Sequence, residues 1–477
     1  MLQDMTEGKP WRLILTFSLP MLLGNIFQQL YNTADSVIVG RYVGSNALAA
    51  VGTSFPVIFF LLSLIMGLTM GSGVVISQFY GAGKLEEVRR SVTTSIIFQV
   101  VCALVMTVIG LIFAGPMLRL LQVPDVIYND SLTYANIFFC GLIFMMGYNS
   151  LSGILRSLGD SRTPLFFLII AAVTNVVLDI YFVASLGWGV AGVAWATLIA
   201  QALSMILCYI YINAKIPLLK FTRQELVFDK DILKTMIKLG IPSSIQQTVV
   251  SMGMMAVQGI VNSFGEITMA AFVAAMRIDS FATMPVQNFS MALSTFGGQN
   301  VGAWRLDRVK EGTKSTLIMS LVTCIVLSIL VFNFGPQLIT IFLDSSDISN
   351  AAVIAQGVEY IITIAYFYVV FAVSMTINGT LRGAGDTMTP MFTSLTNLAV
   401  RVAVAYVLSY GMFGFPELGY KAIWYSIPCG WIAGAVVPIY RYISGKWQQK
   451  ARERYENMKR MTDGDLATQL AFENMES

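Results

Sequence analysis

The sequence predicts an all-α integral membrane protein with twelve transmembrane helices in two six-helix bundles. Composition is the first reason, because 56% of the 477 residues are hydrophobic and only 12% are charged, with a mean hydropathy of +0.70. Soluble proteins carry about 25% charged residues, so a chain this apolar must place most of its surface in lipid. The other two reasons are a series of long apolar segments and an internal repeat.

Twelve apolar segments are long enough to cross the hydrocarbon core, which takes about 20 helical residues. Proline, glycine and charged residues separate them. The first segment is too long for the hydrophobic region of a signal peptide, and no small-residue cleavage site follows it, so we expect it to be retained as a span. In order, the predicted spans are 13–39, 50–76, 92–113, 131–152, 164–185, 190–212, 236–260, 270–293, 315–334, 352–377, 390–410 and 422–442.

The two sides of these spans differ in positive charge. The N-terminus, the even-numbered loops and the C-terminal tail hold 25 of the 30 lysines and arginines, whereas the opposite loops hold three. Cytoplasmic loops of membrane proteins carry the excess of positive charge. Both termini are therefore predicted to be cytoplasmic.

The two halves of the chain repeat each other. GILRSLGDSRTP at 153–164 returns as GTLRGAGDTMTP at 379–390, with seven of twelve positions identical. Six spans in each half give both halves the same topology and place their pseudo-twofold axis along the membrane normal. This pattern is typical of a transporter that rocks two bundles about a central cavity. Duplication without alternating access, as in some channels and membrane enzymes, is the alternative.

The repeat also defines the predicted domains. Residues 1–212 form the N-terminal six-helix bundle, 213–235 a charged cytoplasmic linker and 236–445 the C-terminal six-helix bundle. Residues 446–477 are charged and polar, so we expect a disordered cytoplasmic tail.

The repeated loop lies on the predicted cytoplasmic side in both halves. Arg156 with Asp160, and Arg382 with Asp386, can pair across a tight glycine turn. The prolines that end both motifs suit the first turn of the next helix, where the missing N–H costs nothing. We expect these loops to stabilise helical hairpins and to form part of a cytoplasmic gate.

Ionisable side chains inside spans cost about 2.5–3.5 kcal/mol on insertion scales and are candidates for function. At about 1.5 Å per residue, Asp35, Asp179 and Thr197 lie at one depth, roughly 9–12 Å below the outer surface. Asn175 is one turn from Asp179 on the same helix face. These four groups could share a proton between two carboxylates, or offer oxygen ligands to Na⁺.

The alternative is that these polar groups only join neighbouring helices. The repeat argues against it, because Arg401 and Ala405 occupy the positions in the second half that match Asn175 and Asp179. In the second half, Arg277 and Asp279 share the eighth span, and a buried Arg401 would need Asp279 as its partner. A structural ion pair and a contact with substrate both stay open for these three residues.

Several functions are excluded or disfavoured. There is no histidine, and the five cysteines lie in apolar stretches without a CxxC, which removes the usual zinc sites. No GxxxxGK[ST] is present to bind nucleotide phosphates. The net charge of +3 argues against nucleic acid as a partner. We therefore expect no enzyme and no cofactor, only transport driven by an ion gradient.

Up to about residue 445 the chain resembles the MATE (multidrug and toxic compound extrusion) family. The resemblance rests on the twelve spans in two halves, the repeated loops and three short motifs, which are QQLYNTADSVIVGRYVG at 28–44, QFYGAG at 78–83 and NVVLD at 175–179. Asp35 with Asn175 and Asp179 resembles the DinF-like branch, where these positions bind the coupling H⁺ or Na⁺. Thr197 matches a hydroxyl implicated there, so all four would be metal ligands if the ion is Na⁺.

The resemblance implies multidrug efflux by a monomer in the cell membrane. H⁺ or Na⁺ would enter while small organic compounds, cationic and amphipathic, leave by alternating access. A lipid-linked oligosaccharide flippase of the same wider superfamily is the alternative, for which a strongly basic cavity is expected. The choice of ion and the substrate are left open by the sequence.

Overall fold

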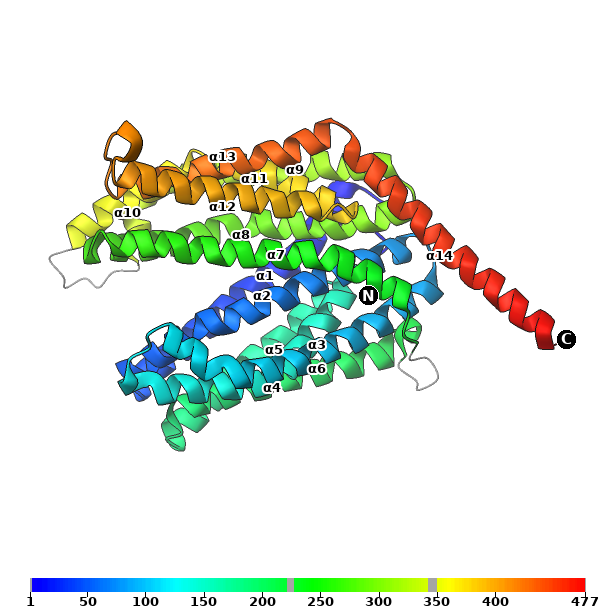
Figure 1. Cartoon of the computed structure of the whole chain (residues 1–477), viewed down its shortest axis with the longest axis horizontal. Coiled ribbons are helices and arrows are strands. Elements are labelled where there is room, and N and C mark those ends of the chain that lie inside the picture. Colours follow the sequence, from blue (N-terminus) through cyan, green and yellow to red (C-terminus); the bar gives the residue numbers. More distant parts are fainter. Residues whose placement is uncertain (1, 221–226, 342–349, 477) are drawn as a thin grey trace. The chain divides into compact units, whose positions relative to one another are not determined.

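The computed structural model describes residues 2–220, 227–341 and 350–476, which form helices and no strand. Figure 1 shows their order along the chain. The helices are α1 (Pro10–Tyr42), α2 (Ser45–Gly81), α3 (Leu85–Leu120), α4 (Asp125–Ser157), α5 (Arg162–Asp179), the π-helix η1 (Ile180–Ser185), α6 (Gly189–Lys215), η2 (Pro217–Leu219), α7 (Lys230–Asn262), α8 (Glu266–Gly302), α9 (Leu306–Thr340), α10 (Asn350–Ala365), α11 (Tyr368–Gly383), α12 (Met388–Ser409), η4 (Met412–Gly414), α13 (Lys421–Ile443) and α14 (Lys446–Glu476).

Ten of the described helices are long and apolar enough to cross a bilayer. A pair of shorter helices, α10 and α11, forms a further candidate span that is bent by 51° at its break. The remaining span is α7, which has 33 residues but carries more polar side chains along its length. The predicted all-α membrane fold of twelve spans is confirmed, and the tenth span proves to be broken.

The chain packs as two compact units. The first contains Met1–Met5, Leu19–Ser244 and Met458–Ser477, and the second contains Thr6–Ser18 and Ile245–Asn457. Helices α1 and α7 therefore each change unit partway along, close to a proline inside each helix. The sequence predicts a division at 213–235, of which 221–226 lie outside the described residues.

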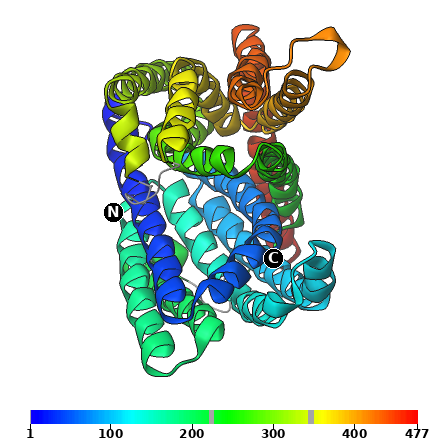
Figure 2. The same cartoon turned by 90° about the vertical axis from the view of Figure 1, so that its left-hand side faces the viewer.

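In the first unit α2, α3, α4 and α6 pack side by side, as both views show (Figures 1 and 2). The start of α7 lies against α2 at unusually close range. A Cβ added at Gly67 or Gly71 would overlap the backbone of Ser244 or Gly240 on α7. Small residues allow such close approach between membrane helices, so these two glycines fix how α2 meets α7.

The first copy of the repeated loop joins α4 to α5. Gly159 has φ +89°, a conformation that glycine adopts at little cost. Asp160 then accepts hydrogen bonds from the backbone N–H groups of Arg162 at 3.1 Å and Thr163 at 3.0 Å. These bonds satisfy donors at the start of α5 that have no partner within the helix. The predicted pairing of Arg156 with Asp160 stays a prediction.

The second copy joins α11 to α12 and corrects one expectation. Asp386 accepts a hydrogen bond from the backbone N–H of Thr389 at 3.3 Å, and its other oxygen lies 2.7 Å from Nε of Arg441 on α13. Among the described residues, Nε of Arg382 is buried without a hydrogen-bond partner. The predicted pair of Arg382 with Asp386 is therefore wrong, because an arginine from α13 reaches the aspartate instead.

The C-terminal segment is not disordered as expected, since α14 covers it up to Glu476. Trp447 and Ala451 are buried in a cluster with residues of α8, α9 and α11. Arg454, one turn further on, packs over Gly385, where an added Cβ would lie 2.9 Å from its Cγ. Burial lowers the pKa of Arg454 to about 10, so the guanidinium stays charged at neutral pH. Of the predicted tail, Ser477 lies outside the described residues.

Candidate ion and substrate sites

The four polar residues predicted in the first half come from three helices of one unit. Asp35 is on α1, Asn175 and Asp179 are on α5, and Thr197 is on α6. Asp179 is fully buried and Asn175 is 2% exposed. Asn175 Nδ2 donates a hydrogen bond of 3.4 Å to Thr197 Oγ1. The side chains of Asp35 and Asp179 lie close enough to interact directly.

Apolar packing next to these residues holds the three helices together. Ile38 and Val39, one turn beyond Asp35, lie in a buried cluster with Val183 of η1 and Val193 of α6. The cluster is separated by about one helical turn from both carboxylates. Burying an ionised carboxylate next to such an apolar cluster is costly unless its charge is neutralised or paired.

Several oxygens of this site are buried and have no hydrogen-bond partner among the described residues. They are Asp35 Oδ1, Asn175 Oδ1, Gln201 Oε1 and both oxygens of Asp179. Buried polar atoms are normally paired, so this concentration of unsatisfied acceptors is unusual. A proton between the carboxylates would satisfy some of them, and a hard cation takes such oxygen ligands.

The site does not have the composition of a transition-metal centre. Within the described part of the chain, no group of three or more His, Cys, Asp or Glu side chains could hold a metal ion. Two carboxylates with amide and hydroxyl oxygens instead suit H⁺ or a hard cation.

Three further residues of this site were missed from the sequence. The phenol of Tyr134 on α4 lies near both Asp35 and Asp179, and that of Tyr31 lies near Asp35. Gln201 lies one turn after Thr197 on α6. Tyr31 and Gln201 could have been found, because each is four positions from a predicted residue and so on the same helix face. Tyr134 comes from another helix and leaves no such signal.

The helix geometry changes directly after Asp179. The chain continues as the π-helix η1 and then turns, with the rings of Phe182 and Trp188 stacked at 4.9 Å. Short π-helical segments within helices are rare and often lie at functional sites. Asp179 is thus the last α-helical residue before the irregular outer end of its span.

The second unit has a different polar cluster, centred on Asp279 of α8. Its carboxylate lies near the hydroxyl of Tyr368 and the guanidinium of Arg401 on α12, but the buried Tyr368 hydroxyl forms no hydrogen bond with the described residues. Arg401 Nε and Asp279 Oδ1 are buried and form no hydrogen bond with the described residues. The predicted pairing of Arg401 with Asp279 therefore stays a prediction. Arg277, two residues from Asp279, is exposed.

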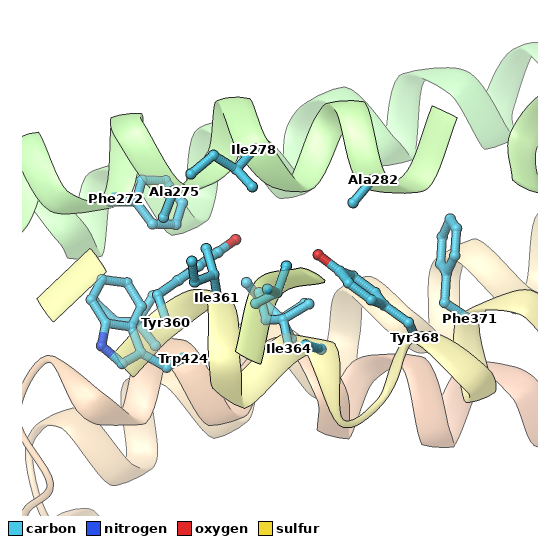
Figure 3. Packing of buried hydrophobic residues seen from close by; sticks show 14 of the residues in the cluster. Phe272, Ala275, Ile278, Ala282, Tyr360, Ile361, Ile364, Tyr368, Phe371 and Trp424 are labelled. Atoms are coloured by element: carbon cyan, nitrogen blue, oxygen red, sulfur yellow. The ribbon is translucent and has the colours of Figure 1, made fainter. Parts of the chain in front are cut away.

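Tyr360 and Tyr368 lie on opposite sides of the break between α10 and α11. Figure 3 shows both hydroxyl groups directed at α8, along the stretch from Ile278 to Ala282. The surrounding side chains belong to a large apolar cluster built from α7 to α13. One phenol on each side of the break in the tenth span therefore points towards α8.

Glu359, the other acidic residue of the tenth span, has a separate role. Its Oε1 lies 2.7 Å from Nζ of Lys421, and the two side chains are 30% and 47% exposed. This pair ties the start of α13 to α10 and leaves Glu359 apart from the buried cluster.

Comparison with known proteins gives consistent matches over nearly the whole chain. A family model described as MatE matches residues 20–181 and 242–407. The chain is 31% identical over 456 residues to the probable multidrug resistance protein YoeA of Bacillus subtilis, covering 94% of this chain and 96% of that protein. It is 25% identical over 464 residues to the probable multidrug resistance protein NorM of Thermotoga maritima, covering 93% and 95%.

Solved structures share the fold at lower identity. A MOP superfamily transporter from Pyrococcus furiosus superposes with a TM-score of 0.85 at 24% identity, covering 96% of this chain and 98% of the other. An outward-facing MATE family multidrug resistance transporter also superposes with a TM-score of 0.85, at 24% identity and the same coverage. At this identity the likeness shows the arrangement of helices and not the chemistry of the sites.

Proposed function

The chain belongs to the MatE family of multidrug efflux transporters, and from this premise we propose that it exchanges H⁺ or Na⁺ for organic compounds. The coupling ion binds in the first bundle, at Asp35, Asn175, Asp179 and Thr197. The observation that carries this proposal is the pair of Asp35 and Asp179, because Asp35 Oδ1 and both oxygens of Asp179 are buried without hydrogen-bond partners among the described residues. That the chain belongs to the DinF-like branch stays a prediction.

The physical argument concerns charge in a low dielectric. Two carboxylates in direct contact repel each other strongly when both are ionised, so one of them must hold a proton or share a cation. With the ion bound, the charge is screened and α1 can pack closely on α5. Without it, repulsion separates the two carboxylates and favours a state that accepts cargo. Ion and cargo therefore favour opposite states, so each weakens the binding of the other.

The proposed cargo is organic, cationic and amphipathic. A site that carries net negative charge after the ion leaves attracts a cation, and aromatic rings near it, such as Tyr31 and Tyr134, add favourable contacts.

We further propose that the protein is a monomer in the cell membrane with both termini in the cytoplasm. The two repeated loops would form its cytoplasmic gate, with Arg156 and Asp160 in one loop and Arg382 and Asp386 in the other. The alternative function is a lipid-linked oligosaccharide flippase, for which a basic cavity is expected. No observation favours the flippase over drug efflux.

The test uses everted membrane vesicles with a fluorescent organic cation. A pH gradient and a Na⁺ gradient are imposed separately, and at least one should drive accumulation of the dye by the wild type. Asp179→Asn and Asp35→Asn should abolish this response. The matched control is Asp307→Asn, because Asp307 is 98% exposed at the start of α9, where it pairs with the exposed Lys310 at 3.8 Å. Wild-type rates in Asp179→Asn would contradict the coupling role.

A further inference from the structure

Two hydrogen bonds fix how α5 and α6 pack against each other in the first unit. Towards the outer end of the helices, Asn175 Nδ2 donates to Thr197 Oγ1 at 3.4 Å. Further inward, which means towards the end of α6 at Lys215 that the charge pattern predicts to be cytoplasmic, Ser204 Oγ donates to the backbone oxygen of Phe167 at 3.4 Å. The two bonds set the register of these antiparallel helices over about two turns.

Gln201 lies between these two bonds, on the face of α6 that contacts α5. Thr197, Gln201 and Ser204 are spaced by four and three residues and therefore share one helix face, and both outer members bond to α5. The residue of α5 at the level of Gln201 is Ala171, which lies one turn from Asn175 and is 5% exposed. Gln201 itself is 9% exposed, and its Oε1 is buried without a hydrogen-bond partner among the described residues. A carbonyl oxygen is thus buried opposite a methyl group.

Asn175 brings a second carbonyl oxygen to the same helix contact. It is 2% exposed, and its Oδ1 forms no hydrogen bond with the described residues, whereas its Nδ2 is used in the bond to Thr197. Gln201 follows Thr197 by one turn, about 6 Å along α6. The order from the outer end inward is therefore the carboxylate of Asp179, the amide of Asn175 and the amide of Gln201.

The amide of Gln201 is not required to pack the fold. The repeat aligns Thr197 with Ile423 of α13, and so aligns Gln201 with Ile427. Ile427 is 3% exposed and lies in the apolar cluster of the second unit. The second unit therefore packs an apolar side chain at this position. Because a buried carbonyl oxygen without a partner is costly, its presence in the first unit indicates a ligand.

We propose that the amide oxygens of Asn175 and Gln201 form an inner binding position for Na⁺, from which the ion leaves towards the cytoplasm. Hard cations take amide carbonyl oxygens as ligands. A carbonyl oxygen accepts hydrogen bonds but takes up no proton at physiological pH, so this position serves Na⁺ and not H⁺. The inference rests on the proposed coupling role of Asp35 and Asp179 and names Na⁺ as the ion.

The absence of charge on the two amides suits a position on the way out. Na⁺ is held more weakly by neutral oxygens than beside the carboxylates, and an ion that must move on requires sites that do not hold it too tightly. The carboxylates receive the ion from the outer side, and the two amides pass it inward between α5 and α6. Loss of the Gln201 oxygen should therefore affect Na⁺ on the inner side alone.

The experiment measures uptake of a fluorescent organic cation by everted membrane vesicles while Na⁺ is varied on each side. The lumen corresponds to the outer side and the bath to the cytoplasm. Na⁺ in the lumen drives uptake, whereas Na⁺ in the bath, exchanged for choline at constant ionic strength and fixed pH, rebinds at the inner position and inhibits it. In Gln201→Met the bath Na⁺ concentration that halves uptake should rise about 10-fold, the lower end of the loss seen when a metal site loses a supporting group. The lumenal Na⁺ concentration for half-maximal uptake should not change.

Matched variants separate a lost ligand from a disturbed helix contact. Ser204→Ala is the control, because its hydroxyl faces α5 but is bonded to the backbone oxygens of Phe167 and Ala200, and it should change neither concentration. Gln201→Glu keeps an oxygen ligand and adds a negative charge, so bath Na⁺ should inhibit at a lower concentration than in the wild type. The melting temperature of each variant in choline checks its folding. Should Gln201→Met not fold, Gln201→Ile takes its place, because Ile427 packs at the equivalent position; if neither folds, an unchanged or higher inhibitory concentration in Gln201→Glu overturns the inference.

The outcomes distinguish this inference from the proposed function. An unchanged inhibitory concentration of bath Na⁺ in Gln201→Met, or equal shifts on both sides of the membrane, would overturn the inner position. If only a pH gradient drives wild-type uptake and Asp179→Asn loses that uptake, the inner position is wrong and the coupling site stands. Wild-type uptake in Asp179→Asn would instead show that the coupling site itself is wrong.

Discussion

Replacing Asp386 by alanine should destabilise the second bundle more than the loss of an exposed ion pair does. Its carboxylate has two roles at the start of α12. One oxygen accepts hydrogen bonds from the backbone N–H of Thr389 at 3.3 Å and from its hydroxyl at 3.0 Å. The other oxygen pairs with Arg441 Nε at 2.7 Å.

The expected loss in the free energy of unfolding follows from the exposure of Asp386 and Arg441. Asp386 is 4% exposed and Arg441 is 29% exposed, so the pair is shielded on one side and near solvent on the other. Breaking a buried pair costs about 3–5 kcal/mol, and the partial exposure of Arg441 places this one near the lower value. Loss of the helix-start hydrogen bonds adds about 1 kcal/mol. Asp386→Ala should therefore lower the free energy of unfolding by about 4 kcal/mol.

The assay is unfolding in mixed detergent micelles, followed by the loss of helical circular dichroism. Arg441→Ala and the double variant complete a mutant cycle, which should return a coupling energy of about 2 kcal/mol. The control is Glu456→Ala, which breaks the exposed pair with Arg452, where the side chains are 50% and 72% exposed. That pair contributes about 0.3–0.5 kcal/mol. Equal losses for Asp386→Ala and Glu456→Ala would refute the reasoning.

Two further predictions concern aromatic packing in the second unit. Trp424 is fully buried and packs on Phe272 and Tyr360. Trp424→Ala should therefore lower the free energy of unfolding by about 3–5 kcal/mol, and Trp424→Phe by clearly less. Equal losses for the two variants in the same assay would show that packing of the aromatic ring does not stabilise the unit. Trp447 on α14 is 1% exposed and stacks on Tyr442 at 5.7 Å. Trp447→Ala should therefore lower the melting temperature measurably, whereas an unchanged value would mean that α14 does not stabilise this unit.

Much of the fold follows from the sequence because hydrophobicity decides which segments enter lipid. The twelve spans and the repeated loops are local properties of the chain. The bend in the tenth span cannot be read from the local sequence. The residues between α10 and α11, Tyr366 and Phe367, include no proline or glycine. The break lies between Tyr360 and Tyr368, whose hydroxyls both point at α8 (Figure 3).

The C-terminal helix was missed for a related reason. The segment is polar on average, and an average hides a narrow apolar face. Trp447, Ala451 and Arg454 recur at spacings of four and three, which places them on one side of a helix. Reading this periodicity would have predicted a docked helix in place of a disordered tail.

The candidate ion site was partly predictable from the depth of polar residues in their spans. Counting positions brought Asp35, Asp179 and Thr197 to one level, and the structure places their side chains in one unit around Asn175. The contribution of Tyr134 could not be found this way, because α4 packs against this site only in three dimensions.

The central claim is that one ion and one drug compete through the carboxylates of Asp35 and Asp179. The most direct measurement is the affinity of the purified protein for a fluorescent organic cation from about pH 5 to about pH 9, with and without Na⁺. Drug affinity should fall as the coupling ion saturates its site, and Asp179→Asn should lose this dependence. If the wild-type affinity stays constant in both series and Asp179→Asn is indistinguishable from it, the competition is refuted and Asp179 is only a contact between helices.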